Sequence, residues 1–179
     1  MKRLAVIGLG LIGASCCAAI KERASGWNIS GYSRTEATRQ QALAKGLIDQ
    51  SFDSIAGAVR QAALILIAVP MGQFRQVFEN VNAARDSSSV VTDAGSTKGS
   101  VIHDIVSVLE STPSWFVPGH PIAGSEQSGV DAANPDLYVD HQVILTPDLN
   151  TAADAIDLVS SFWKIQGASC LLYTSPSPR

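Results

Sequence analysis

The stretch VIGLGLIGAS, Val6 to Ser15, decides the fold, because its glycines at positions 8, 10 and 13 have GxGxxG spacing. A β-branched apolar run precedes the first glycine, and a segment of helical period follows the last. In this context the first glycine allows a tight turn, the second lets the backbone approach a pyrophosphate, and the third lets helix and strand pack closely. The stretch therefore predicts a dinucleotide-binding domain, with the positive end of the helix facing the phosphates.

Short β-branched runs alternate with longer stretches of helical period along the rest of the chain. This alternation is typical of a parallel sheet with crossover helices, so we predict an α/β, Rossmann-like doubly wound fold with a mostly parallel sheet. The expected strands are Leu4–Gly8, Ile29–Tyr32, Leu64–Val69, Val90–Asp93, Trp115–Val117 and Gln142–Leu145. The expected helices are Ile12–Ala24, Glu36–Lys45, Gly72–Ala84, Lys98–Glu110 and Ala152–Ile165, the fourth of them capped by Ser96 or Thr97.

Composition narrows the class of ligand. The chain has 179 residues, 46% of them hydrophobic, and a net charge of −3 with no basic stripe, which disfavours nucleic acid and anionic membrane as partners. The longest apolar run, Ala62–Met71, is too short to span a bilayer, and the start of the chain lacks a cleavage site for secretion. We therefore expect a cytoplasmic protein that binds a small molecule.

The cysteines indicate neither a disulfide framework nor a metal site. Cys16 and Cys17 are adjacent in an expected helix, and Cys170 stands alone. We interpret them as small apolar side chains, and we expect no bound metal.

The segment GYSRT, Gly31 to Thr35, favours NADP over NAD. An NAD site has an acidic residue at the end of the second strand, which accepts hydrogen bonds from the ribose hydroxyls. Here Ser33 and Thr35 offer hydroxyls and Arg34 offers a charged planar donor, which suits a 2′-phosphate. The alternative is that Arg34 is a solvated residue at a helix start.

Ligands of an open parallel sheet bind outside the carboxyl ends of its strands. Three segments follow such ends: AVPMG (68–72), DAGSTKGS (93–100) and PGHPIAGSEQSG (118–129). His120 is their only side chain that titrates near neutral pH, so we predict that it takes a hydroxyl proton while hydride leaves the same carbon. Ser96 could orient the imidazole or the substrate hydroxyl, whereas His103 and His141 are interpreted as structural. We expect the cofactor to contact Gly8, Gly10, Leu11, Ile12, Gly13, Ser33, Arg34, Thr35, Val69 and Pro70.

The segments GLGLIGAS, DAGSTKG and GHPIAGSEQSGVDAA, in this order and spacing, resemble the prephenate and arogenate dehydrogenases of tyrosine biosynthesis over about Lys2–Gly167. The resemblance implies an oxidative decarboxylation in which hydride passes to the nicotinamide, a histidine takes the hydroxyl proton, and loss of carboxylate gives an aromatic product. The matching positions are His120 for the base, Ser96 for its serine partner and Glu126 for an acidic residue at the substrate entrance, with Thr97 beside Ser96 in the substrate site.

The resemblance also implies a helical second domain, which supplies further substrate-binding side chains and a homodimer interface. No segment of this sequence corresponds to that domain. After Gly167 the sequence ASCLLYTSPSPR has no helix or strand period. We therefore expect an NADP-binding domain over residues 1–168 and a tail over 169–179 that is a truncation scar or a readthrough sequence.

Two alternative functions remain open at this point. One is a fragment that binds NADP and catalyses nothing. The other is a relative of the β-hydroxyacid dehydrogenases, whose base is a lysine, because Lys98 is the only lysine in the candidate site segments.

Overall fold

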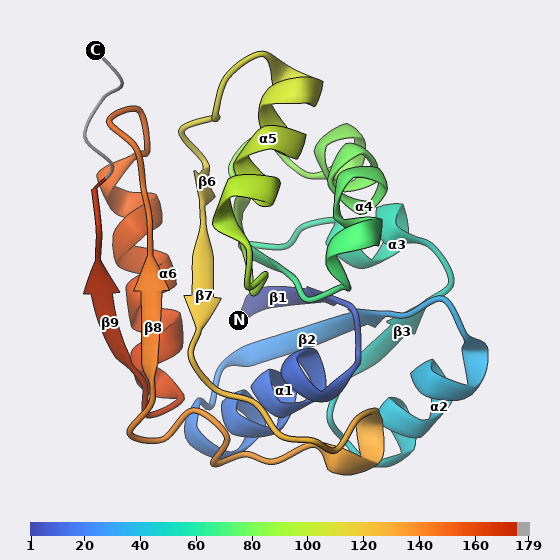
Figure 1. Cartoon of the computed structure of the whole chain (residues 1–179). Helices are drawn as coiled ribbons and strands as arrows, with labels where there is room; N and C mark the ends of the chain where they lie inside the picture. Colours follow the sequence, from blue (N-terminus) through green and yellow to red (C-terminus); the bar gives the residue numbers. More distant parts are fainter. Residues whose placement is uncertain (175–179) are drawn as a thin grey trace.

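The computed structural model describes residues 1–174, and its main element is a six-stranded parallel sheet in the order β3-β2-β1-β4-β5-β6 (Figure 1). The strands are β1 (Lys2–Ile7), β2 (Trp27–Tyr32), β3 (Gln50–Phe52), β4 (Leu64–Ile67), β5 (Val90–Asp93) and β6 (Phe116–Val117). The helices that connect them are α1 (Leu11–Arg23), α2 (Glu36–Ala44), α3 (Ile55–Val59), α4 (Met71–Ala84) and α5 (Lys98–Leu109). This is the strand order of a Rossmann fold, so the predicted fold class is confirmed.

Both faces of the sheet are buried, and successive strand residues enter different cores. Leu4 and Val6 of β1 belong to one core, whereas Ala5 and Ile7 belong to the other. This alternation follows from the two-residue period of a strand, and burial on both faces explains why the central strand β4 is wholly apolar. Helices α3, α4 and α5 cover one face, and α1 covers the other together with α6 (Ala153–Ile165) (Figure 1).

A smaller sheet continues from the edge of the larger one. It has the order β7-β8-β9, with β7 (Gly119–Pro121) antiparallel and β9 (Ser169–Leu172) parallel to β8 (Gln142–Leu145). Figure 1 shows α6 packed beside β8 and β9. Ser169–Leu172, which the sequence analysis placed in a tail beyond residue 168, pair with β8 along its length and so belong to this sheet. Of the expected tail, only residues 173–179 follow β9, and 175–179 lie outside the described part of the chain.

Several short elements were not predicted. Strand β3 and helix α3 lie in a segment that was left unassigned, and β7 was expected to be a loop. The predicted helix cap is also wrong in one respect: Thr97 is the residue before the first turn of α5, but its side chain makes no capping hydrogen bond. The other predicted elements are present with small shifts at their ends.

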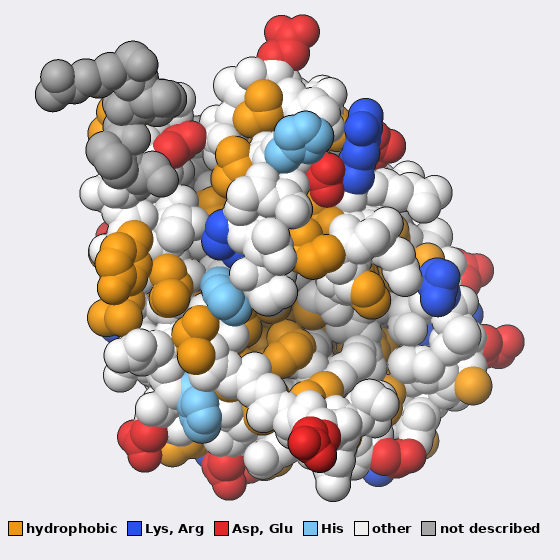
Figure 2. Space-filling model, in the orientation of Figure 1, with side chains coloured by type: hydrophobic (Ala, Val, Ile, Leu, Met, Phe, Trp, Pro, Cys, Tyr) orange, Lys and Arg blue, Asp and Glu red, His pale blue; other side chains and the backbone are white. Residues whose placement is uncertain are grey.

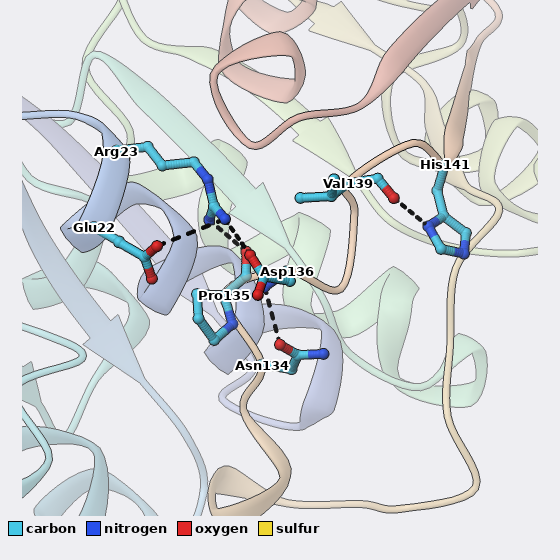
Figure 3. Close-up of polar contacts among 7 residues, drawn as sticks. All are labelled: Glu22, Arg23, Asn134, Pro135, Asp136, Val139 and His141. Carbon is cyan, nitrogen blue, oxygen red and sulfur yellow. Dashed lines mark hydrogen bonds and ion pairs between the residues drawn. The ribbon is translucent and has the colours of Figure 1, made fainter.

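The connection between β7 and β8 crosses α1 and is tied to its end (Figure 3). Arg23 donates one hydrogen bond to the carbonyl of Pro135 at 2.5 Å and another to the carboxylate of Asp136. The amide of Asp136 is bonded in turn to the side chain of Asn134 at 2.9 Å. The short helix η1 (Val130–Ala132) precedes this tie, so the connection is fixed along the α1 face of the large sheet.

The cysteines of α1 have the environment that the sequence predicted. Cys16 and Cys17 are fully buried, and burial raises the pKa of Cys16 to about 12. Cys170 lies on β9 and is only partly buried. Among residues 1–174, no helix combines the length and the apolar character that a membrane crossing requires.

Candidate functional site

The glycine loop joins β1 to α1, and the space around its three glycines differs. Gly8 has a φ of +104°, and a Cβ there would lie 2.3 Å from the carbonyl oxygen of Ala68. A Cβ on Gly13 would lie 1.9 Å from the carbonyl oxygen of Gly8. At Gly10 a Cβ would meet no atom within 4 Å. Two glycines therefore serve close packing, and the middle one faces open space.

The first turn of α1 presents free backbone amides to that space. Gly10 is the residue before the helix, no side chain caps it, and the first turn carries no acidic residue. The amides of an uncapped helix start, with the partial positive charge of the helix dipole, make a ready site for an anion.

A cavity of about 410 Å³ lies next to this loop. It brings together six of the residues predicted for the cofactor, which are Gly8, Gly10, Ser33, Arg34, Val69 and Pro70. Leu11, Ile12, Gly13 and Thr35 do not line it, and the Thr35 hydroxyl is instead 2.6 Å from that of Thr38. Helix α4 adds three polar side chains that the sequence analysis missed, Gln73, Gln76 and Asn80. Their spacing along one helix face is a signal that could have found them.

Arg34 is exposed at the rim of this cavity, and a second arginine is bonded to the backbone of the same loop. Arg39 of α2 donates hydrogen bonds to the carbonyls of Ser33 and Arg34, at 2.6 and 3.3 Å. Because these bonds fix the backbone from which the Arg34 side chain extends, Arg39 shapes the loop without lining the cavity.

A second cavity, of about 320 Å³, contains both predicted catalytic residues. Ser96 follows β5 and His120 lies on β7, and no hydrogen bond joins the two within residues 1–174. The remaining lining residues carry no charge, and they are Ile12, Val69, Pro70, Met71, Ala94, Gly95, Pro121 and Ala123. Val69 and Pro70 also line the first cavity, so the two cavities share a wall. On the face seen in Figure 2, hydrophobic side chains gather around the hollowed centre, and acidic side chains lie mostly toward the rim.

The environment of His120 favours its uncharged form. Partial burial lowers the pKa of the imidazole, the cation of Lys98 lowers it further, and the carboxylate of Asp93 opposes both effects. A neutral imidazole can accept a proton, which an imidazolium cannot.

The other predicted site residues lie outside both cavities. Thr97 and Glu126 are exposed, and neither lines a cavity. His103 is exposed on α5, with its Nδ1 3.7 Å from the carboxylate of Asp104. The Nδ1 of His141 lies 2.8 Å from the carbonyl of Val139, as Figure 3 shows. The last two contacts agree with a structural interpretation of these histidines.

Lys98 does not line either cavity, although it lies close to His120. Its amino group donates hydrogen bonds to the Asp93 carboxylate and to the carbonyl of Gly119. An amine held by two acceptors is poorly placed to serve as a base for a ligand. In the described part of the chain, no group of three His, Cys, Asp or Glu side chains could hold a metal ion.

Comparison with known proteins agrees with this geometry. The family model described as prephenate dehydrogenase, nucleotide-binding domain, matches residues 16–172. Cyclohexadienyl dehydrogenase of Zymomonas mobilis is 39% identical over 163 residues, which cover 91% of this chain and 55% of that protein. The chain spans about half the length of the curated relatives it matches.

The backbone of this chain is also similar to those of solved structures. Prephenate dehydrogenase from A. aeolicus, in complex with hydroxyphenyl propionate and NAD+, superimposes with a TM-score of 0.88 at 28% identity, over 97% of this chain and 60% of that one. Synechocystis arogenate dehydrogenase gives a TM-score of 0.87 at 27% identity, over 96% and 59%. The resemblance inferred from the three sequence motifs is thereby confirmed, and the chain belongs to the prephenate dehydrogenase family, through the nucleotide-binding domain of that family.

Proposed function

We propose that the chain is the NADP-binding half of a prephenate or arogenate dehydrogenase, which oxidises and decarboxylates a cyclohexadienyl acid to an aromatic product. The observation that carries this proposal is the shared wall of the two cavities, formed by Val69 and Pro70. A nicotinamide that extends from the first cavity toward the second would lie beside His120.

The residues of the first cavity fit a phosphorylated dinucleotide. Gly10 leaves room for a pyrophosphate against the free amides of α1, because a Cβ at that position would meet nothing. The guanidinium of Arg34 at the rim suits a 2′-phosphate, which it can bind through two parallel hydrogen bonds. When bound, the nicotinamide supplies the acceptor for the hydride of the substrate.

The residues of the second cavity would handle the proton. A ring nitrogen of His120 would take the substrate's hydroxyl proton, and the Ser96 hydroxyl would orient either the imidazole or the substrate. By the resemblance, Glu126 would act at the substrate entrance and Thr97 beside Ser96 in the substrate site, and both side chains are exposed. Formation of the aromatic ring supplies driving force, so the task of the protein is to align hydroxyl, base and nicotinamide.

A chimera tests the proposed activity. Residues 1–172 are joined to the remaining part of the Zymomonas mobilis protein, and NADPH formation is followed with prephenate and with arogenate. We expect turnover with one of the two acids, and no turnover by the 179-residue chain or by the added part alone. A folded chimera that binds NADPH but oxidises neither acid would instead support the silent binding fragment.

Cofactor preference is tested by fluorescence titration of this chain with NADPH and NADH. Arg34→Gln is expected to weaken NADPH binding by about tenfold or more, the usual worth of a charge-assisted bond, and to leave NADH binding nearly unchanged. Arg60→Gln is the matched control, because Arg60 is exposed and lines neither cavity. Tighter binding of NADH than of NADPH by the unaltered chain would rule out the role given to Arg34.

A further inference from the structure

Asp93, the last residue of β5, is a fully buried carboxylate that joins three segments. Its Oδ2 accepts hydrogen bonds from the amide of Gly95 at 2.8 Å and from the amino group of Lys98. Its Oδ1 accepts the amide of Gly119 at 3.0 Å. All three partners are donors, which is the pattern of an ionised carboxylate rather than a protonated one. Although burial raises the pKa of Asp93, the cation of Lys98 and the two amides oppose that effect.

Lys98, the first residue of α5, completes the arrangement. Its amino group reaches the Asp93 carboxylate and also donates to the carbonyl oxygen of Gly119 at 2.6 Å. The amide of Gly119 is therefore held by Asp93, and its carbonyl is held by Lys98. No other residue fits at this point, because a Cβ on Gly119 would lie 2.8 Å from the carbonyl oxygen of Asp93.

The next residue in the chain is His120. The two hydrogen bonds to the Gly119 backbone therefore fix the position of the backbone from which the His120 side chain extends. On its other side β7 pairs with β8, where Ile144 stands opposite His120. Among the described residues, the charged groups that act on the imidazole are Lys98 and Asp93, with effects of opposite sign. The side chains that share its cavity from α1, from the end of β4 and from α4 are Ile12, Val69, Pro70 and Met71, and none of them is charged.

We propose that Asp93 and Lys98 are positioning residues for His120, because together they clamp the Gly119 peptide from which His120 follows. The same geometry places one anion and one cation beside that peptide, and their charges act on the imidazole with opposite signs. The catalytic use of this arrangement rests on the proposed function, but the arrangement itself does not.

The test is an NMR titration of the His120 ring in this 179-residue chain, assigned with His120→Gln. Lys98→Met removes the cation and leaves the Asp93 anion, so the titration midpoint of His120 is expected to rise by about half a pH unit or more. Lys98→Arg keeps the charge and is expected to restore most of the original midpoint. Asp93→Asn keeps an oxygen acceptor and removes the anion, so the midpoint is expected to fall.

The expected shifts of the His120 midpoint have opposite signs in Lys98→Met and Asp93→Asn. A general loss of structure would instead move the midpoint of both variants toward that of a free histidine. An unchanged midpoint in folded Lys98→Met or Asp93→Asn would overturn the proposal. Should both variants fail to fold, hydrogen exchange in the unaltered chain decides: the Gly119 amide is expected to be protected like core amides, and rapid exchange would overturn the clamp. None of these measurements uses substrate or cofactor, so failure of the proposed dehydrogenase activity would leave their outcome unaffected.

Discussion

His120→Gln is expected to lower the turnover of the active chimera by about 10²–10⁴-fold, the usual contribution of a positioned general base. Glutamine resembles the imidazole in size and can still form hydrogen bonds, but it cannot take up a proton near neutral pH. Binding of NADPH should change little, because His120 lies in the second cavity and does not line the first. Steady-state kinetics together with NADPH titration separate these two effects.

His103→Gln is the matched control for this experiment. His103 is exposed on α5 and lines neither cavity, so the same chemical change there should leave turnover intact. A His120→Gln chimera that retains most of its rate would show that another group takes the hydroxyl proton.

The second large effect is on stability. Gly13→Ala is expected to lower the free energy of unfolding of this chain by about 3 kcal/mol or more, and Tm by roughly 10 °C. A Cβ there would lie 1.9 Å from the Gly8 carbonyl oxygen, and a backbone atom at the turn cannot move aside cheaply. The gain that alanine normally brings inside a helix, about 1 kcal/mol, is too small to compensate.

Gly10→Ala provides the comparison within the same loop. Its Cβ would meet no atom within 4 Å, so the free energy of unfolding should stay within about 1 kcal/mol of the original. Urea unfolding of the two variants checks the contrast. Equal stability of both would mean that the loop accommodates a side chain at Gly13, against the packing described above.

The first half of the fold could be predicted because its signals are local. The GxGxxG spacing and the helical period after it identify β1 and α1, and apolar runs bounded by turn residues identify β4 and β5. The smaller sheet depends on pairing between distant segments, and its strands are only three or four residues long. Strand β7 reads GHP, in which glycine and proline suggest a turn, but proline is tolerated because β7 is an edge strand.

The candidate site divides in the same way. His120 and Ser96 could be placed near each other because both follow strands whose carboxyl ends lie at one edge of the sheet. Arg39 was missed because its role is to bond backbone carbonyls of the loop before α2, which no side-chain pattern reports. The partnership of Asp93, Lys98 and Gly119 was missed for a similar reason, since it joins three segments through one buried carboxylate.

The contact of Gly8 with the end of β4 links the cofactor loop to a segment far along the chain. Ala68 donates its amide to the carbonyl of Ile7 at 2.8 Å, and its own carbonyl lies where a Gly8 side chain would be. The loop therefore has its binding shape only when β1 and β4 are paired, and an unfolded chain has no affinity for the dinucleotide to retain. By thermodynamic linkage, each tenfold excess of cofactor over its dissociation constant then adds about 1.4 kcal/mol to the stability of the folded state, so a chain with bound nucleotide is expected to resist proteolysis longer than a chain without it.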